Sequence, residues 1–210
     1  MELALIAEGT SDKVLIPPIR WLCTNIQPNL AYEIEPIIFD NVSPKPDLSA
    51  KVEIVLRQDR HQIILVHRDQ DNMTRIDRTR EIETAVKSAQ HRLPSATAST
   101  FIPIIPVRMT EAWFLIDEAA IKKAAGFPNN RTLLNLPNAR QLESVADAKN
   151  MLYEKIRTAS GHTGRKLRKV RPQQIIHTLA DVIEDYSVLN KLPAFWSLRQ
   201  DLTAAIVAVA

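Results

Sequence analysis

Four consecutive aliphatic residues stand in the stretch QIILVHRDQDN, residues 62–72. Polar residues border this run, from Ile63 to Val66, on both sides. The pattern is typical of a strand buried on both faces, as the strands of parallel sheets are. Two acids follow it, Asp69 and Asp71, and their spacing makes both side chains lean to the same side if the backbone stays extended. The stretch therefore predicts a central strand that ends in an acidic pair.

The rest of the chain up to residue 120 repeats this alternation of strand and helix. A first strand is expected in ELALIAEGTSDK, residues 2–13, where the apolar run ends at Glu8. Further extended runs are expected at 33–39, which Pro36 interrupts, and at 101–107, whose two prolines indicate a sheet edge or an irregular strand. Pro17 and Pro18 suit a first helical turn and predict a helix at 17–25, which leaves a loop at 9–16. Apolar residues at helical spacing predict two more helices, at 48–57 and 82–93.

This order of elements predicts an α/β fold with a mostly parallel sheet and helices on both faces, because parallel neighbours need crossover connections. From Asp117 onward the pattern becomes helical, with helices expected at 139–159, 173–186 and 197–208. We therefore expect an α/β domain over 1–120 and a helical C-terminal subdomain over 121–210. The loop at 160–172 would lie within that subdomain.

Composition restricts the class of protein. The chain has 210 residues, 45% of them hydrophobic, which is enough for a substantial core. Its one cysteine, Cys23, cannot form an internal disulfide or a cysteine-rich zinc site, and its apolar neighbours predict a buried thiol. No segment approaches the ~20 apolar residues of a membrane span. No charged leader precedes the first strand, so we expect a cytoplasmic protein without a membrane partner.

Carboxylates follow three of the predicted strands, at the sheet edge where α/β folds bind ligands. They are Glu8, Asp69 with Asp71, and Glu111. Carboxylates brought together repel one another unless a cation compensates them. Mg²⁺, or Mn²⁺ in its place, suits such oxygen ligands and often binds together with substrate phosphates, which favours phosphodiester chemistry.

Each of these acids also has a purely structural interpretation. Glu8 followed by Gly9 is typical of a solvated turn, with the glycine relieving backbone strain. The Asp-x-Asp pair also occurs as a simple cap of the next helix. Glu111 could equally be an acid in a first helical turn, with Thr110 as the cap. Only the combination of the acids favours a functional site.

Together these motifs resemble the Toprim family of topoisomerases, primases and nucleases. The segment AEGTSDK, residues 7–13, looks like the family's opening glutamate motif, and ILVHRDQDN, residues 64–72, looks like its Asp-x-Asp motif. The segment VRMTEAWFLID, residues 107–117, is similar to the Arg-x-x-Glu-Ala-Trp signature of a small Toprim-like branch, often encoded beside ATPases in suggested phage-defence modules. The resemblance covers residues 1–120 and implies a Rossmann-like sheet.

The resemblance also implies roles for the acids. Glu8 would be the general acid/base or a metal ligand, and Asp69 and Asp71 would coordinate Mg²⁺. Glu111 would complete the acidic site, and Asp12 would occupy the position where related nucleases often have a second acid. Asp12 is thus either an acid that contacts the metal ligands without binding the metal itself, or only the cap of the next helix.

Three basic residues near these motifs need an interpretation of their own. Arg108 would lie near the phosphate. His67 and Arg68 depart from the family's pattern, which has small or apolar residues before the Asp-x-Asp motif. Arg68 could neutralise a carboxylate, which would weaken metal binding, or bind phosphate through its guanidinium. His67 could be a proton shuttle, although a strand-end histidine bonded to the backbone is the commoner outcome.

The loop at 160–172 carries the densest group of cations: Arg165, Lys166, Arg168, Lys169 and Arg171. Such a cluster can bind a nucleic-acid backbone without sequence preference. It could instead be solvated, or pair with Glu184 and Asp185. Four aromatic residues could stack on bases, but their spacing favours burial in the core: Trp113, Phe114, Phe195 and Trp196.

The sequence thus favours a Mg²⁺-dependent Toprim-like nuclease, the effector of an ATPase-paired phage-defence system. Its partners would be DNA or RNA, an ATPase, and in a homo-oligomer a second copy of the chain. The alternative is a noncatalytic Toprim-like module that binds an ATPase or nucleic acid. A third possibility is a phosphohydrolase with an aspartyl nucleophile. Such an enzyme is expected to carry the Asp-x-Asp motif after its first strand, whereas here the motif follows the third strand.

Overall fold

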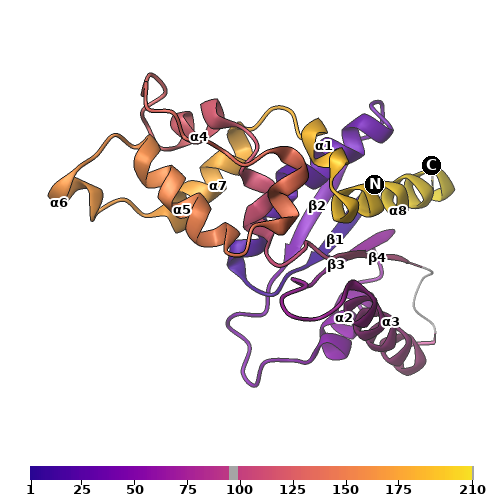
Figure 1. Ribbon diagram of the computed structural model, residues 1–210. Coiled ribbons are helices and arrows are strands. Elements are labelled where there is room, and N and C mark those ends of the chain that lie inside the picture. Colours follow the sequence, from indigo (N-terminus) through magenta and orange to yellow (C-terminus); the bar gives the residue numbers. More distant parts are fainter. Residues whose placement is uncertain (95–98, 210) are drawn as a thin grey trace.

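The computed structural model describes residues 1–94 and 99–209, and a sheet of four strands lies between two layers of helices (Figure 1). The strands are β1 (Glu2–Ile6), β2 (Glu33–Ile37), β3 (Ile63–His67) and β4 (Thr100–Ile104). Their order across the sheet is β2-β1-β3-β4, and all three pairings are parallel. The predicted α/β class is confirmed.

Alternate residues of the strands supply two separate hydrophobic cores. In β1, Leu3 and Leu5 pack on one face, against α1 (Ile16–Ile26) and α8 (Pro193–Val209). Ala4 and Ile6 pack on the other face, against α2 (Leu48–Leu56) and α3 (Arg75–Arg92) (Figure 1). Strand β3 is buried along its whole length, as its aliphatic run predicts. The sheet is therefore covered on both sides.

The two outer strands are the ones that contain proline. Pro36 lies in β2 and Pro103 in β4. Because proline has no N–H to donate, it is tolerated where a strand has a neighbour on one side only. The expected edge position of the fourth strand is confirmed, although β4 ends at Ile104, three residues earlier than predicted.

After the sheet the chain is helical, as expected, and most of it packs on the α1 side. The elements are η2 (Thr110–Phe114), α4 (Glu118–Ala124), η3 (Ala139–Ser144), α5 (Ala148–Ala159), α6 (Gly164–Leu167), α7 (Pro172–Val182) and η4 (Ser187–Lys191), followed by α8. Buried residues of α4, α5, α7 and α8 join the same core as Leu3 and Leu5. The helical region and that face of the sheet therefore share one core.

Several predicted boundaries were wrong. The expected loop at 9–16 contains a 3₁₀-helix, η1 (Thr10–Leu15). The single helix expected at 139–159 is two elements, because Val145 is extended and Asp147 caps a new helix by accepting the N–H of Asn150. The helix expected at 173–186 ends at Val182, and α8 begins at Pro193 rather than at 197.

The prediction of buried aromatic residues holds for three of the four. Trp113, Phe114 and Phe195 are 1%, 0% and 0% exposed, and Trp113 meets Phe195 edge to face at 5.1 Å between ring centroids. Trp196 is 44% exposed, so its assignment to the core was wrong.

Cys23 is buried, and burial raises the pKa of its thiol to about 12. Within the described part of the chain, no helix has the length and apolar character needed to cross a membrane.

Candidate functional site

The predicted acids meet in one cleft of about 290 Å³ at the carboxyl ends of the strands. The chain leaves β1 for β2 on one side and returns to β3 on the other, so a crevice is expected beyond the ends of β1 and β3. Five acids line the cleft: Glu8, Asp12, Asp69, Asp71 and Glu111. Parallel pairing thus brings together residues more than a hundred positions apart.

Asp12 fixes the turn that carries Glu8. One carboxylate oxygen of Asp12 accepts the backbone N–H of Glu8 at 2.7 Å and that of Gly9 at 3.3 Å. Asp12 lies inside η1 and caps that short helix by accepting the N–H of its N-cap Gly9, whereas it does not cap α1, which begins at Ile16. Gly9 has φ −161°, an extended conformation open to any residue, so relief of backbone strain does not explain this glycine.

His67 lies beneath the acids at 1% exposure and connects three of the polar groups. Its Nδ1 is 3.0 Å from Asp12, and its Nε2 is 3.2 Å from the hydroxyl of Thr110. That hydroxyl and the Thr110 backbone N–H both donate to Asp69 at 3.2 Å. The expectation that this histidine bonds to the backbone was therefore wrong.

These contacts favour a charged imidazole ring. Nδ1 faces the Asp12 carboxylate, and the Thr110 hydroxyl oxygen can accept from Nε2 because its own hydrogen is donated to Asp69, so a ring protonated on both nitrogens donates in both contacts. Burial disfavours the charge, yet hydrogen bonds to Asp12 and Asp69 outweigh it and raise the pKa of His67 to about 9. The pKa of Asp12 is lowered, because its bonds to His67 and to the backbone exceed the effect of its own burial. A fixed positive charge thus lies under the cleft.

A second set of cations is paired with the acids from the side. Arg68 contacts Glu8 at 2.6 Å and Glu81 of α3 at 3.0 Å. Arg78, also on α3, contacts Glu81 at 2.8 Å and Asp71 at 3.0 Å. Of the two roles considered for Arg68, the ion pair with Glu8 corresponds to the neutralisation of a carboxylate. The result is an alternating row of charges from Glu8 to Asp71.

Glu111 enters the cleft from η2. Glu111 lies in the first turn of η2, as its structural interpretation expected, but the N-cap is Met109, so the expectation that Thr110 caps the helix was wrong. Lys149 of α5 lies 3.7 Å from the Glu111 carboxylate. Burial raises the pKa of Glu111, partly opposed by Lys149, and burial also raises the pKa of Glu8, opposed by Arg68. Two carboxyls of the cleft are therefore easier to protonate than ordinary ones.

The backbone is strained at the mouth of the cleft. Asp71 has φ +50° and Arg108 has φ +62°, a region that residues with side chains rarely adopt. The two residues are joined, because the Asp71 N–H donates to the Arg108 carbonyl at 3.3 Å. Such conformations cost about 1–3 kcal/mol each and cluster at functional sites. The Arg108 side chain is exposed and is not among the groups that line the cleft.

The carboxylates have the chemistry of a Mg²⁺ site but not its assembled geometry. Their oxygens are the hard ligands that this ion prefers. However, over residues 1–94 and 99–209 no three His, Cys, Asp or Glu side chains are grouped to hold a metal. Instead, Glu8 forms an ion pair with Arg68, and Asp71 forms one with Arg78. A divalent cation would therefore have to displace these arginines before it could bind the same carboxylates.

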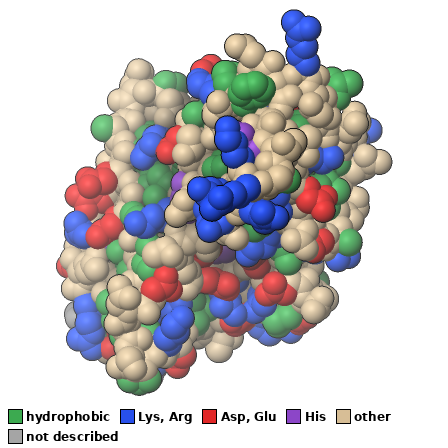
Figure 2. Space-filling model, turned by 90° about the vertical axis from the view of Figure 1, so that its left-hand side faces the viewer, with side chains coloured by type: hydrophobic (Ala, Val, Ile, Leu, Met, Phe, Trp, Pro, Cys, Tyr) green, Lys and Arg blue, Asp and Glu red, His purple; other side chains and the backbone are tan. Residues whose placement is uncertain are grey.

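The stretch 160–172, expected to be a loop, contains the short helix α6, so that prediction was wrong in part. This basic segment lies at the same edge of the molecule. Helix α6 projects from the body at this edge, and the face seen in Figure 2 has a group of Lys and Arg side chains above a belt of acidic ones. All five of the basic side chains in this segment are exposed. Within the described ranges, none of them forms an ion pair within 4.0 Å. The alternative of pairing with Glu184 and Asp185 was therefore wrong.

Sequence reasoning missed four polar residues that contact the predicted site residues, two in the lining of the cleft and two beside it on α3. Thr110 was considered only as a cap, and Arg78, Glu81 and Lys149 were not considered. The spacing of Arg78 and Glu81 on one helix after the Asp-x-Asp motif is the one signal that could have identified them. Comparisons of the chain with protein-family models, with curated proteins and with solved structures found no match.

Proposed function

We propose that this protein is a Mg²⁺-dependent, Toprim-like nuclease that hydrolyses phosphodiester bonds of nucleic acid. The observation that carries the proposal is the meeting of Glu8, Asp69, Asp71 and Glu111 in one cleft at the carboxyl edge of a parallel sheet. The five cations of the 160–172 segment, which form no ion pair with any residue of 1–94 or 99–209, suit a polyanionic substrate, and Figure 2 shows Lys and Arg side chains gathered above the acidic ones. The strained pair of Asp71 and Arg108 adds support.

Each group of the cleft then has a task. Glu8, Asp69, Asp71 and Glu111 would hold the metal, which when bound would activate water and stabilise the leaving oxygen. Asp12 and the charged His67 hold the Glu8 turn and Asp69 in place. Glu8 and Glu111, whose pKa values are raised in the metal-free chain, would accept or return a proton whenever they are not bound to the metal. Arg68 would move from Glu8 to a substrate phosphate.

A nuclease assay tests the proposal. The protein, alone and with any ATPase encoded beside it, is incubated with DNA and RNA in Mg²⁺ or Mn²⁺. We expect cleavage that EDTA abolishes and that Glu8→Gln and Asp69→Asn lower by at least ~100-fold, the effect of losing a catalytic proton-transfer group or ligand. Glu83→Gln, an exposed acid of α3, is the matched control and should cleave normally.

The rival is a noncatalytic module of a cytoplasmic defence complex, and the row of ion pairs from Glu8 to Asp71 favours it. In that case Arg68, Arg78 and Glu81 compensate the acids permanently and the cleft is structural. Absence of cleavage under every condition, with an ATPase or nucleic acid still bound, would favour this rival. Cleavage that survives in both substituted proteins would reject the proposed site.

A further inference from the structure

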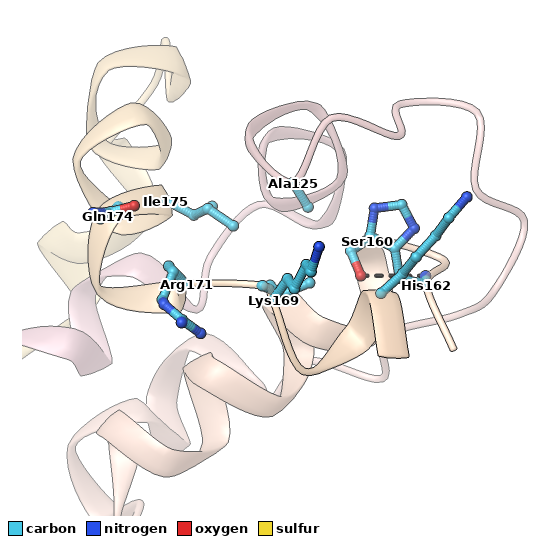
Figure 3. A pocket seen from close by; sticks show the side chains of 9 residues that line it. Ala125, Ser160, His162, Lys169, Arg171, Gln174 and Ile175 are labelled. Carbon is cyan, nitrogen blue, oxygen red and sulfur yellow. Dashed lines mark hydrogen bonds between the residues drawn. The ribbon is translucent and has the colours of Figure 1, made fainter. Parts of the chain in front are cut away.

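A pocket of about 370 Å³ lies between the end of α4, the segment after α5 and the start of α7 (Figure 3). A neighbouring groove of about 680 Å³ shares Val170 and Arg171 with this pocket. Gln173 lines both the groove and the acidic cleft, and the next residue, Gln174, lines the pocket. The pocket thus adjoins the groove, the groove adjoins the acidic cleft, and the first turn of α7 stands between the cleft and the pocket.

The lining of the pocket combines cations with an apolar side. Its positive groups are Lys166, Lys169 and Arg171, and its apolar groups are Ala125, Val170 and Ile175. In Figure 3, Ala125, Lys169 and Ile175 point toward a common space that His162 and Ser160 border on the opposite side. Among the residues that the structure describes, no carboxylate lines the pocket or the groove. The chemistry matches a ligand with both a planar apolar part and a phosphate.

We propose that this pocket takes one unpaired nucleotide of the strand that is cut in the acidic cleft. The proposal rests on the nuclease function above and specifies its substrate as single-stranded nucleic acid. The base would lie against Ile175 and the exposed imidazole of His162, since histidine is among the side chains on which unpaired bases stack. Lys166 and Lys169 would bind the phosphates on either side.

The spacing of the hollows agrees with a continuous strand. They lie on two sides of α7, and a helix with its side chains is about 10 Å across. A stacked strand advances about 3.4 Å per nucleotide, so at least about three nucleotides would be needed to pass this helix. A duplex keeps its bases stacked and paired inside, and could not insert one into the pocket without unpairing it. Unpaired substrate is therefore favoured.

The test is fluorescence anisotropy in EDTA, which prevents cleavage, with a labelled single strand and with a duplex of the same sequence. We expect His162→Ala to weaken binding of the single strand by about fivefold to a hundredfold, the range for loss of one stacking contact, and to leave the duplex unchanged. The double substitution of Lys166 and Lys169 to alanine should weaken both and reduce the salt dependence of binding. His91→Ala and Lys87→Ala, on the exposed face of α3, are the matched controls.

The outcomes separate this inference from the nuclease proposal. If His162→Ala weakens the binding of single strand and duplex equally, or weakens neither, the proposed nucleotide pocket is rejected even if the protein cleaves nucleic acid. Failure of the unsubstituted protein to bind the single strand overturns it as well. Displacement of the strand by free mononucleotide at equal concentration would also overturn it, since the pocket would then serve free nucleotides. If His162→Ala weakens binding of the single strand alone while the native protein shows no cleavage in the nuclease assay, the nucleotide pocket is supported and the nuclease proposal is rejected.

Discussion

His67 is the residue on which the order of the acidic cleft depends. It is buried at the end of β3 and joins Asp12, which holds the Glu8 turn, to Thr110 and Asp69. A buried imidazolium is stable only when its hydrogen-bonding partners compensate the loss of water. Here both of its nitrogens are bonded. One side chain therefore links loops that follow three different strands.

The stability of the protein should depend on pH through His67. Its pKa is about 9 in the folded state, above the ordinary 6.5, so the folded state binds more protons than the unfolded state between these values. The free energy of unfolding should be highest below pH 6.5 and fall as pH rises to about 9, by up to roughly 3 kcal/mol. Urea denaturation across this range measures the change.

The control for this prediction is His67→Gln, in which the fall over the same pH range should disappear. The ring proton signals of His67 in NMR spectra should also titrate near pH 9 in the native protein. A stability that stays flat in the native chain, or a ring that titrates near 6.5, would show that Asp12 and Asp69 do not hold the charge.

Arg68 should compete with divalent metal for Glu8. Its guanidinium contacts the carboxylate at 2.6 Å, and a cation that binds Glu8 must displace it. We expect Arg68→Gln to bind Mg²⁺ or Mn²⁺ about tenfold more tightly, equivalent to about 1.4 kcal/mol, in calorimetric titration. Arg57→Gln, an exposed arginine that pairs with Glu53 on α2, should bind as the native chain does. Unchanged or weaker binding would mean that Arg68 assists the site.

At the scale of elements, the strands were easier to predict than the helices of the second half. The aliphatic run of β3 and the proline positions in β2 and β4 indicated burial and edge placement directly. The 3₁₀-helices η1 and η2 gave no such signal, because a helix of one or two turns has too few residues to show an apolar period. These two short elements carry Asp12, Thr110 and Glu111.

At the scale of the whole molecule, the helical second half completes the core of the sheet. Helix α8 and the buried residues of α4, α5 and α7 belong to the same core as Leu3, Leu5, Ile63 and Leu65. A division into domains at residue 120 therefore stays a prediction, and the shared core argues that the first part depends on the second. Removing the helices would expose one face of the sheet to water.

A fragment of residues 1–117 should accordingly fail to fold by itself. Without the helical region, α1 is left to cover the face of Leu3 and Leu5, and Trp113 loses its contact with Phe195. We expect no cooperative unfolding of the fragment in urea and rapid amide exchange in β1 and β3, in contrast to the full chain. A cooperative transition with slow exchange in these strands would instead establish an independent α/β domain.

The sequence by itself determined the parallel α/β sheet and the acids at its carboxyl edge, because strand periodicity and the residues that follow each strand are local properties. Only the tertiary structure decided which cation each acid meets. Arg78 and Glu81 come from α3, and Lys149 comes from α5. Their approach depends on how helices pack on the sheet and on each other, and no short stretch of sequence encodes that packing.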